Sequence, residues 1–201
     1  MVTWLGNSPP EKFVYTSSTS VYAQYDGSLV TEQSPAQPET ATAQVLVQTE
    51  QLLLAAARNH FPAIVLRVAG IYGPGRGHAF KQFLSSEARI EGNGSRFLNM
   101  IHRDDLTGVI MAALERGRPG EIYNAADNEP VTQREFFEWL ATRLKRPLPP
   151  RVDAHEEVRR KRGLTNKRVS NAKLRAELGY EFKFPDFRAG YEALCVEALK
   201  H

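Results

Sequence analysis

The sequence predicts an α/β fold built on a parallel β-sheet, and three segments in the first third of the chain predict it. Residues 13–16 are a short strand-prone run, residues 40–59 carry apolar side chains at helical spacing, and residues 63–68 are almost all apolar. A continuous apolar strand is typical of a parallel sheet covered on both faces by helices. Strand, helix and strand in this order predict a right-handed βαβ unit.

Local signals set the ends of these elements. Two prolines precede the first strand, a polar, proline-bearing loop over residues 23–38 follows it, and Pro62 stands just beyond the predicted helix. The helix has one apolar face, formed by Ala43, Leu46, Val47, Leu53, Leu54 and Ala57. The second strand ends in a glycine-rich turn over residues 70–77.

The rest of the chain predicts more helices and one more sheet strand. We expect helices at residues 80–84, 106–114, from 132 onward, 170–178 and 187–199, a hairpin tip at 92–94 and a third sheet strand at 121–125. The helix at Thr132 has the clearest start, because Thr132 and Glu135 form a capping box and Val131 and Phe136 a hydrophobic staple.

Composition limits the class of protein. The 201 residues, 42% hydrophobic, are enough for one sizeable core or a core with a small lobe. A formal charge of +3 is too mild to indicate nucleic-acid binding. The single cysteine, Cys195, excludes an intrachain disulfide and is expected to be buried and inert. No apolar run or export signal indicates a membrane or secreted role, so we expect a cytoplasmic protein.

Five stretches resemble, in order, the later part of the extended short-chain dehydrogenase/reductases, the NAD-dependent epimerase/dehydratase family with its atypical members. They are FVYTSSTSVY (residues 13–22), LRVAGIYGPGR (66–76), IHRDDL (101–106), IYNAAD (122–127) and KRVSNAKL (167–174). The resemblance covers nearly the whole chain. It implies a partial Rossmann-like parallel sheet, containing the later strands only, with a small C-terminal substrate lobe.

The resemblance also implies a division of the chain. Residues 1–78 correspond to the second half of the coenzyme domain, and residues 79–201 are mainly the substrate lobe, with a returning sheet strand near 121–126. The family binds NAD or NADP on an N-terminal glycine fingerprint, which residues 1–12 lack and the turn at 73–78 does not replace. About 90 residues, three βαβ units, would precede this chain, so we expect a fragment or a truncated reading frame.

The resemblance assigns roles to residues near the first two strands. Ser18, four residues before Tyr22, takes the position of the catalytic hydroxyl. Coenzyme contacts fall on Ser17, Tyr72, Gly73 and Pro74, and substrate contacts on Thr19, Arg76 and Arg103; no metal is implied. From the residues alone, the hydroxyl run also suits a strand end that satisfies its own backbone groups, and the glycines also suit a sharp turn.

The family's proton-relay pair is missing. Its tyrosine and lysine precede the glutamate represented here by Glu50, and counting back from Glu50 reaches Thr42 and Leu46. Neither side chain can replace the pair near neutral pH. A phenol from elsewhere remains an alternative, and the tyrosines considered are Tyr22, Tyr25 and Tyr72, each of which also suits a packed ring.

Several charged residues have predicted roles. Asp104 or Asp105 is predicted to cap a helix, and Arg67 is predicted to pair with an acidic side chain. The basic residues Arg159, Arg160, Lys161, Arg162, Lys167 and Arg168 suit a solvated helix face, a phosphate or nucleotide site, or nucleic acid. Because no aromatic residues interleave with them, nucleic acid is the least favoured of the three.

Two functions therefore stand. The first is the C-terminal part of an NAD(P)-dependent epimerase/dehydratase-like oxidoreductase acting on a sugar nucleotide or a similar carbonyl compound. The second is a non-catalytic ligand-binding or regulatory protein on the same scaffold, favoured by the missing pair. In either case we expect self-association through the open sheet edge at residues 13–16.

Overall fold

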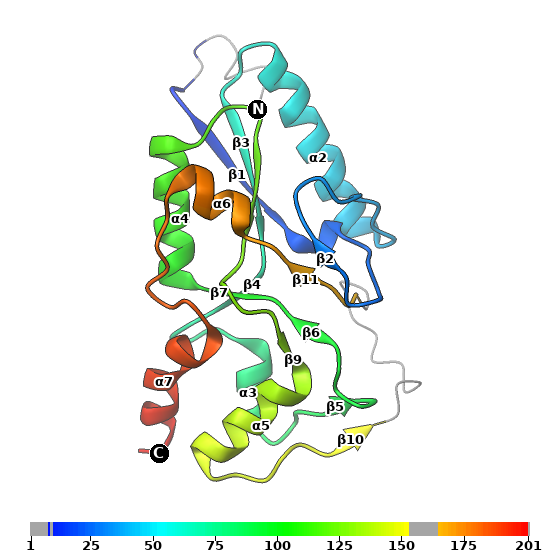
Figure 1. Ribbon diagram of the computed structural model, residues 1–201, viewed down its shortest axis with the longest axis vertical. Coiled ribbons are helices and arrows are strands. Elements are labelled where there is room, and N and C mark those ends of the chain that lie inside the picture. The colour runs from blue at the N-terminus through cyan, green and yellow to red at the C-terminus, as the bar shows by residue number, and fades with distance from the viewer. Residues whose placement is uncertain (1–7, 9, 153–164, 201) are drawn as a thin grey trace.

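The structure is a computed structural model that describes residues 8, 10–152 and 165–200. Its centre is a three-stranded parallel sheet in the order β1, β3, β8 (Figure 1). These strands are Phe13–Ser18, Ala63–Val68 and Ile122–Ala125. Every residue of β3 is buried, as the apolar run predicts. Within the described residues, no further strand pairs with the outer edge of β1. The predicted partial Rossmann-like sheet is confirmed.

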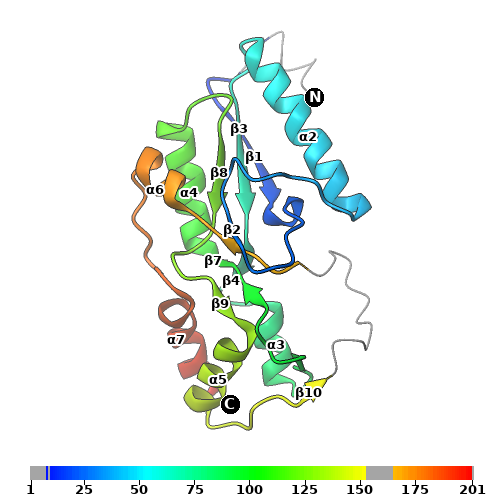
Figure 2. The same ribbon diagram turned by 45° about the vertical axis from the view of Figure 1, so that its right-hand side comes forward.

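Helices cover both faces of the sheet. Figures 1 and 2 show α2 (Ala41–Arg58) on one face, and α4 (Arg103–Arg116) with α6 (Ala172–Leu178) on the other. Alternation along β3 explains this, because Ile64 and Leu66 pack among the residues of α4 and α6 while Ala63 packs against Leu53 of α2. Thr40 caps α2 by accepting a hydrogen bond from the Ala43 N–H.

A second group of elements lies beyond the carboxyl ends of these strands. It contains α3 (His78–Leu84), α5 (Gln133–Leu144) and α7 (Phe187–Ala198). These helices lie together at one end of the molecule, and the central sheet lies toward the other end (Figure 1). Their aromatic core includes Phe136, Phe187 and Tyr191. The capping box of Thr132 and Glu135 is present at the start of α5, as predicted. The division of the chain at residue 78 stays a prediction.

Short strand pairs lie outside the central sheet. β4 (Gly70–Tyr72) runs parallel to β7 (Met100–His102). Three further pairs are β2 (Leu29–Val30) with β11 (Arg168–Val169), β5 (Ile90–Glu91) with β10 (Arg151–Val152), and β6 (Phe97–Leu98) with β9 (Val131–Thr132), of which only the last is antiparallel. Figure 1 shows β2 and β11 at the junction of the two groups. A short 3-10 helix, η1 (Thr19–Val21), follows β1.

Two local predictions are wrong. Residues 92–94 do form a turn, but the flanking strands β5 and β6 pair with distant strands and not with each other as a hairpin. The cap of α4 is His102, whose Nδ1 accepts a hydrogen bond from the Asp104 N–H. Asp105 is fully buried and accepts hydrogen bonds from the Tyr180 hydroxyl and from the backbone of residues 183–184. It therefore anchors a distant segment.

Candidate functional site

The hydroxyl run lies at the carboxyl end of β1, where Ser18 is opposite Val68 of β3. Ser17 donates its hydroxyl proton to Glu50 Oε1 at 2.5 Å. Ser18 Oγ accepts the Ser20 N–H at 3.2 Å and so caps η1. An accepting hydroxyl keeps its own proton, and that of Ser18 has no acceptor within the described residues. Ser18 can therefore donate to a further oxygen, whereas the Ser17 proton is already used.

A buried polar network lies beside these serines. Arg67 binds Glu50 through Nε and Nη2, with an Nη2 to Oε2 distance of 2.7 Å. Its Nη1 donates to the Tyr22 hydroxyl at 2.9 Å, and that hydroxyl donates to Asn124 Oδ1 at 2.8 Å. The expected pairing of Arg67 with an acidic residue is confirmed. The network links β3, β8, α2 and the segment after η1 at one end of the sheet.

The network does not acidify a phenol. Burial raises the pKa of Tyr22, although the nearby Arg67 cation opposes the rise. For Arg67, burial works to lower the pKa, but Glu50 and Tyr22 outweigh it and the net shift is upward. Tyr22 is fully buried, so its hydroxyl stays protonated and occupied within the network. It serves as a structural connection between strands.

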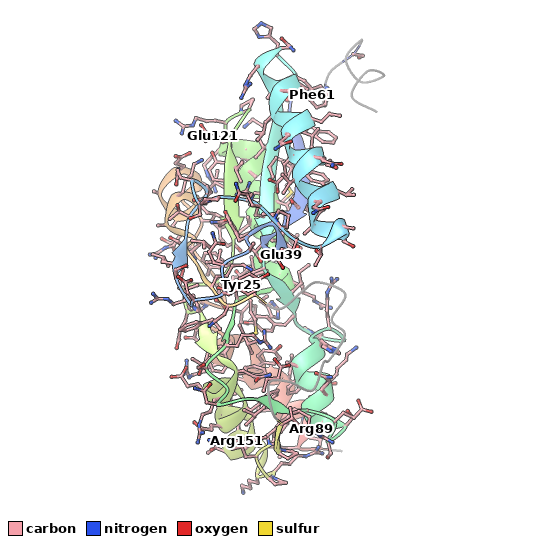
Figure 3. The ribbon with its side chains drawn as sticks, turned by 90° about the vertical axis from the view of Figure 1, so that its right-hand side faces the viewer. Tyr25, Glu39, Phe61, Arg89, Glu121 and Arg151 are labelled. Carbon is pink, nitrogen blue, oxygen red and sulfur yellow. The ribbon has the colours of Figure 1, made fainter. Side chains whose placement is uncertain are left out.

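The other tyrosine near the site faces solvent. Tyr25 is 52% exposed and lies beside Glu39 in the loop that precedes α2 (Figure 3). Its hydrogen bond to Glu39 raises the pKa of Tyr25. On α2 itself, Thr42 is exposed and Leu46 is half-buried. The positions expected to hold the tyrosine and lysine pair therefore offer no acid or base.

Tyr72 belongs to a packed aromatic cluster. Its ring stacks on Tyr191 of α7 with centroids 4.4 Å apart and meets His102 edge-on. Its hydroxyl donates to the Asp186 carbonyl at 3.3 Å. A Cβ added at Gly190 would lie 2.1 Å from the Tyr72 hydroxyl oxygen, so only glycine permits this approach. Burial raises the pKa of Tyr72 and keeps the phenol neutral.

The glycine turn is held by the start of α4. Gly73 and Arg76 exchange two backbone hydrogen bonds, and Arg103 Nη1 donates to the Pro74 carbonyl at 3.0 Å. Gly73 has a φ of 140°, and a Cβ there would come within 3.1 Å of His102 Nε2. Arg103 therefore supports the turn directly, and the arginine expected to contact substrate also has a structural role.

The structure groups the expected site residues into two sets. Ser17, Ser18 and the buried Thr19 lie together at the end of β1. Tyr72, Gly73, Pro74, Arg76 and Arg103 form the second set, around the turn after β4. The first set lies at the carboxyl end of β1, and the second lies at the end of β4, which follows β3 in the chain and pairs with β7. The carboxyl ends of parallel strands form the edge where α/β sheets bind ligands. Ser18 and Tyr72 face different surroundings, a strand end and an aromatic cluster.

Two charged side chains in this region are buried, which the sequence did not predict. Asp127, just after β8, is 2% exposed and its Oδ2 has no hydrogen-bond partner in the described residues. Lys167, just before β11, is 5% exposed. Lys167 belongs to the basic set for which the sequence leaves three interpretations open, and the members of that set at 159–162 lie outside the described residues. In the sequence, both residues lie within stretches that resemble the family.

The residues fit one end of a coenzyme better than the other. The end of β1 presents hydroxyl groups and the turn after β4 presents backbone groups, and the resemblance predicts that these line a nicotinamide ring. A phosphate cradle needs glycines between a strand and a helix N-terminus, and residues 1–12 contain no such pattern. Within the described ranges, no three His, Cys, Asp or Glu side chains gather to hold a metal. The same ranges contain no helix suited to crossing a bilayer.

The fold and this edge define a class, the α/β proteins whose parallel sheet binds nucleotides at the carboxyl ends of its strands. Within that class, residues 1–126 match the model of the NAD dependent epimerase/dehydratase family. The chain belongs to that family.

Individual relatives agree with this assignment. Protein YeeZ of Escherichia coli is 30% identical over 178 residues, which are 87% of this chain and 59% of YeeZ. A solved protein of unknown function from Silicibacter pomeroyi is 34% identical with a TM-score of 0.81, covering 94% of this chain and 66% of that one. The dTDP-glucose 4,6-dehydratase of Bacillus anthracis, solved with NAD, has a TM-score of 0.85 at 22% identity, covering 100% and 65%. This last likeness shows the fold alone. The chain thus spans about three fifths to two thirds of these proteins.

Proposed function

We propose that this chain supplies the catalytic hydroxyl and the nicotinamide-end wall of an NAD(P)-dependent epimerase/dehydratase-like oxidoreductase that acts on a sugar nucleotide. The observation that supports the proposal is that the Ser18 hydroxyl proton has no acceptor in the described part of the chain. Its hydroxyl stands at the carboxyl end of β1, accepts the Ser20 N–H and keeps its own proton for a substrate oxygen.

The substrate class rests on similarity and chemistry together. Family members compared with this chain include a dTDP-glucose dehydratase with NAD bound. Bound coenzyme would take up or return a hydride. Ser18 would donate a hydrogen bond to the substrate oxygen, while Gly73 and Pro74 would shape the wall beside the ring. Thr19, Arg76 and Arg103 would contact the substrate, and Ser17 would contact coenzyme through its remaining lone pairs. The cytoplasm is the compartment that we propose.

A second candidate function has one specific observation in its favour. Thr42 is exposed and Leu46 is half-buried on α2, and neither carries a proton that can be transferred near neutral pH. A protein that binds coenzyme or substrate through the same edge, with no redox step, would need neither a tyrosine nor a lysine there.

Coenzyme titration separates the two functions. NADH and NADPH fluorescence would be titrated with the 201-residue chain alone and with a separately expressed glycine-rich βαβ half. Turnover of a nucleoside-diphosphate sugar in the presence of both halves supports the oxidoreductase. Binding without turnover supports the second function. No coenzyme binding under either condition contradicts the oxidoreductase and limits the second function to a protein that binds another ligand.

A pair of serine variants then tests the assigned residue. Ser18→Ala should lower turnover by about 10²- to 10⁴-fold, the usual contribution of a positioned proton donor, and leave coenzyme affinity unchanged. Ser20→Ala is the matched control, because it removes a hydroxyl from the same segment and keeps the N–H that Ser18 accepts. Equal activity in both variants would remove Ser18 from the reaction.

A further inference from the structure

Asp127 is a buried carboxyl group in which one oxygen lacks a partner. The side chain is 2% exposed, its Oδ1 accepts the Glu129 N–H at 3.3 Å, and its Oδ2 has no hydrogen-bond partner in the described part of the chain. An ionised carboxylate can only accept hydrogen bonds, and its charge is costly to bury without compensation. These surroundings therefore favour a carboxyl that keeps its proton.

The segment that carries Asp127 is held firmly on the side of the sheet. The Asp127 N–H donates to the Met100 carbonyl of β7 at 2.7 Å. Asn171, which precedes α6, donates from Nδ2 to the Ala126 carbonyl at 3.0 Å and to Asn128 Oδ1 at 2.8 Å. Residues 126–128 are therefore fixed to β7 and to the start of α6.

The same segment contacts the start of α7, and we call the contact between residues 127–129 and 185–188 the α7 clasp. The Asn128 N–H donates to the Pro185 carbonyl at 2.9 Å. Arg188 Nη1 donates to both carboxylate oxygens of Glu129, at 2.8 and 2.9 Å. This ion pair is exposed on both sides, and exposed pairs contribute little. The clasp is thus held by few polar contacts.

Negative groups surround Asp127 at the clasp. Burial raises the pKa of its carboxyl well above the usual range, although the hydrogen bond from the Glu129 backbone opposes the rise. The carboxylates of Asp186, Glu129 and Asp105 add to the rise. Asp186 caps α7 and Asp105 lies in the first turn of α4, so the charges come from three separate segments. None of these groups is a cation that could compensate an ionised Asp127.

Two neutral phenols lie near the same carboxyl. Burial, and after it the charge of Asp127, raises the pKa of Tyr72 and of Tyr191, so both phenols keep their protons at neutral pH. The Tyr72 hydroxyl donates to the Asp186 carbonyl at 3.3 Å, and its ring stacks on Tyr191. The clasp therefore adjoins the aromatic contact that holds Tyr72 against α7, just before the turn at 73–76.

We propose that the α7 clasp is a proton-dependent conformational device. It is closed while the Asp127 carboxyl carries a proton, and loss of that proton opens it. An ionised Asp127 in the closed form would be a buried charge among other carboxylates. Opening breaks the hydrogen bond from Asn128 to Pro185 and lets water reach the carboxylate. The inference does not depend on the proposed function, because every contact lies within this chain.

Amide hydrogen exchange of the 201-residue chain between pH 5 and pH 8 measures the opening. The Asn128 N–H is the reporter, because it donates across the clasp. Its protection, corrected for the intrinsic pH dependence of exchange, should fall about tenfold per pH unit until the closed form itself loses the proton. The reason is that the open form has an ordinary carboxyl, which is ionised above about pH 4.

An amide of the central sheet provides the reference for wider unfolding. The Val65 N–H of the buried strand β3 donates to the Glu121 carbonyl, away from the clasp. Its exchange requires the sheet to open, so at pH 5 it should be protected more strongly than the Asn128 N–H. Different protection of the two amides separates opening of the clasp from unfolding of the chain.

Three variants assign the pH dependence. Asp127→Asn should remove it at Asn128, because the amide has the shape of the carboxyl and does not ionise. Glu197→Gln, which removes an exposed carboxylate from α7, is the matched control and should leave the slope unchanged. Asp186→Asn keeps a capping side chain and removes a neighbouring charge, so the slope should end at a lower pH.

The outcomes are distinct. Opening of the Asn128 N–H that is independent of pH in the unchanged chain would overturn the clasp. An equal slope in Asp127→Asn, or equal protection of Asn128 and Val65 at every pH, would overturn it too. A slope that is lost in Asp127→Asn and kept in Glu197→Gln supports it. Near-ultraviolet circular dichroism checks that each variant is folded, and Asp186→Asn decides the matter should Asp127→Asn fail to fold.

Discussion

Arg67 and Glu50 form a buried ion pair, in which Nη2 and Oε2 are 2.7 Å apart and both side chains are at most 5% exposed. The pair joins the central strand β3 to α2, and Ser17 donates a further hydrogen bond to the same carboxylate. Each side chain thus compensates the charge of the other. Loss of one would leave the other as a buried charge without a counterion.

Glu50→Gln should lower the free energy of unfolding by about 3 to 5 kcal/mol, because Arg67 keeps its charge and loses its counterion. Urea denaturation measures the change. The double variant Glu50→Gln, Arg67→Met should recover part of the loss. Glu138→Gln breaks the exposed pair with Arg134 and should cost about 1 kcal/mol or less. Equal losses at Glu50 and Glu138 would contradict the buried pair's importance.

Asp127→Asn should stabilise the protein at neutral pH. Burial raises the pKa of the Asp127 carboxyl well above its usual range, and the carboxylates of Asp186, Glu129 and Asp105 add to the rise. The folded state then holds a proton that the unfolded state has released, so stability falls as the pH rises above about 4, the unfolded pKa.

Urea denaturation between pH 5 and pH 8 checks this pH dependence. The unchanged chain should lose stability with rising pH, and Asp127→Asn should remove that part of the slope. Asp26→Asn is the control and should leave the slope in this range unchanged, because the hydrogen bonds from Ser28 lower the pKa of the exposed Asp26 and its carboxyl is ionised in both folded and unfolded states above pH 5. Parallel pH profiles for the unchanged chain and Asp127→Asn would show that Asp127 titrates normally.

Thr132→Ala should lower the free energy of unfolding by about 1 kcal/mol. It removes the acceptor for the Glu135 N–H and the hydroxyl that donates to Glu135 Oε2 at 2.7 Å. Thr132→Ser keeps both bonds and should stay within a few tenths of a kcal/mol of the unchanged chain. Thermal unfolding measures both variants, and a loss as large in the serine variant would assign the effect to the missing methyl group.

The open edge of β1 should mediate self-association. Phe13 donates its N–H to the Pro62 carbonyl on the β3 side, so the alternate residues Val14, Thr16 and Ser18 turn their backbone groups to the outer edge. Thr16→Lys places a charge at the exposed centre of that edge and should reduce the weight-average mass in sedimentation velocity. Thr49→Lys, on the surface of α2, is the control. A monomeric unchanged chain would contradict the prediction.

Local sequence signals predicted most of the central sheet. The apolar run of β3 and the stripe of α2 are periodic patterns that each segment carries by itself, and Thr132 with Glu135 is a motif of four residues. These elements agree with the structure because their determinants are neighbours in the chain. The hydroxyl run also lies where the sequence predicted, at the end of β1.

Other features depended on distant contacts. In the sequence, Asp105 is a candidate cap for α4, but its carboxylate accepts hydrogen bonds from residues 180, 183 and 184. The residue that caps α4 is His102. Strands β5 and β6 flank a glycine turn and pair with other partners. In each case, the residue or strand could form hydrogen bonds with a partner nearby in the sequence or with a distant one. It bonds to the distant partner because packing of the folded chain brings that partner close.

The amino-acid sequence by itself determined the α/β class, the order of the main elements and the hydroxyl position of Ser18, because helical and strand periodicity and capping act over a few residues. Only the tertiary structure decided that Ser18 keeps a free proton while Ser17 does not, and that Asp127 is buried beside the start of α7. Burial and charge compensation are properties of packed neighbours, and folding brings those neighbours together from far along the chain.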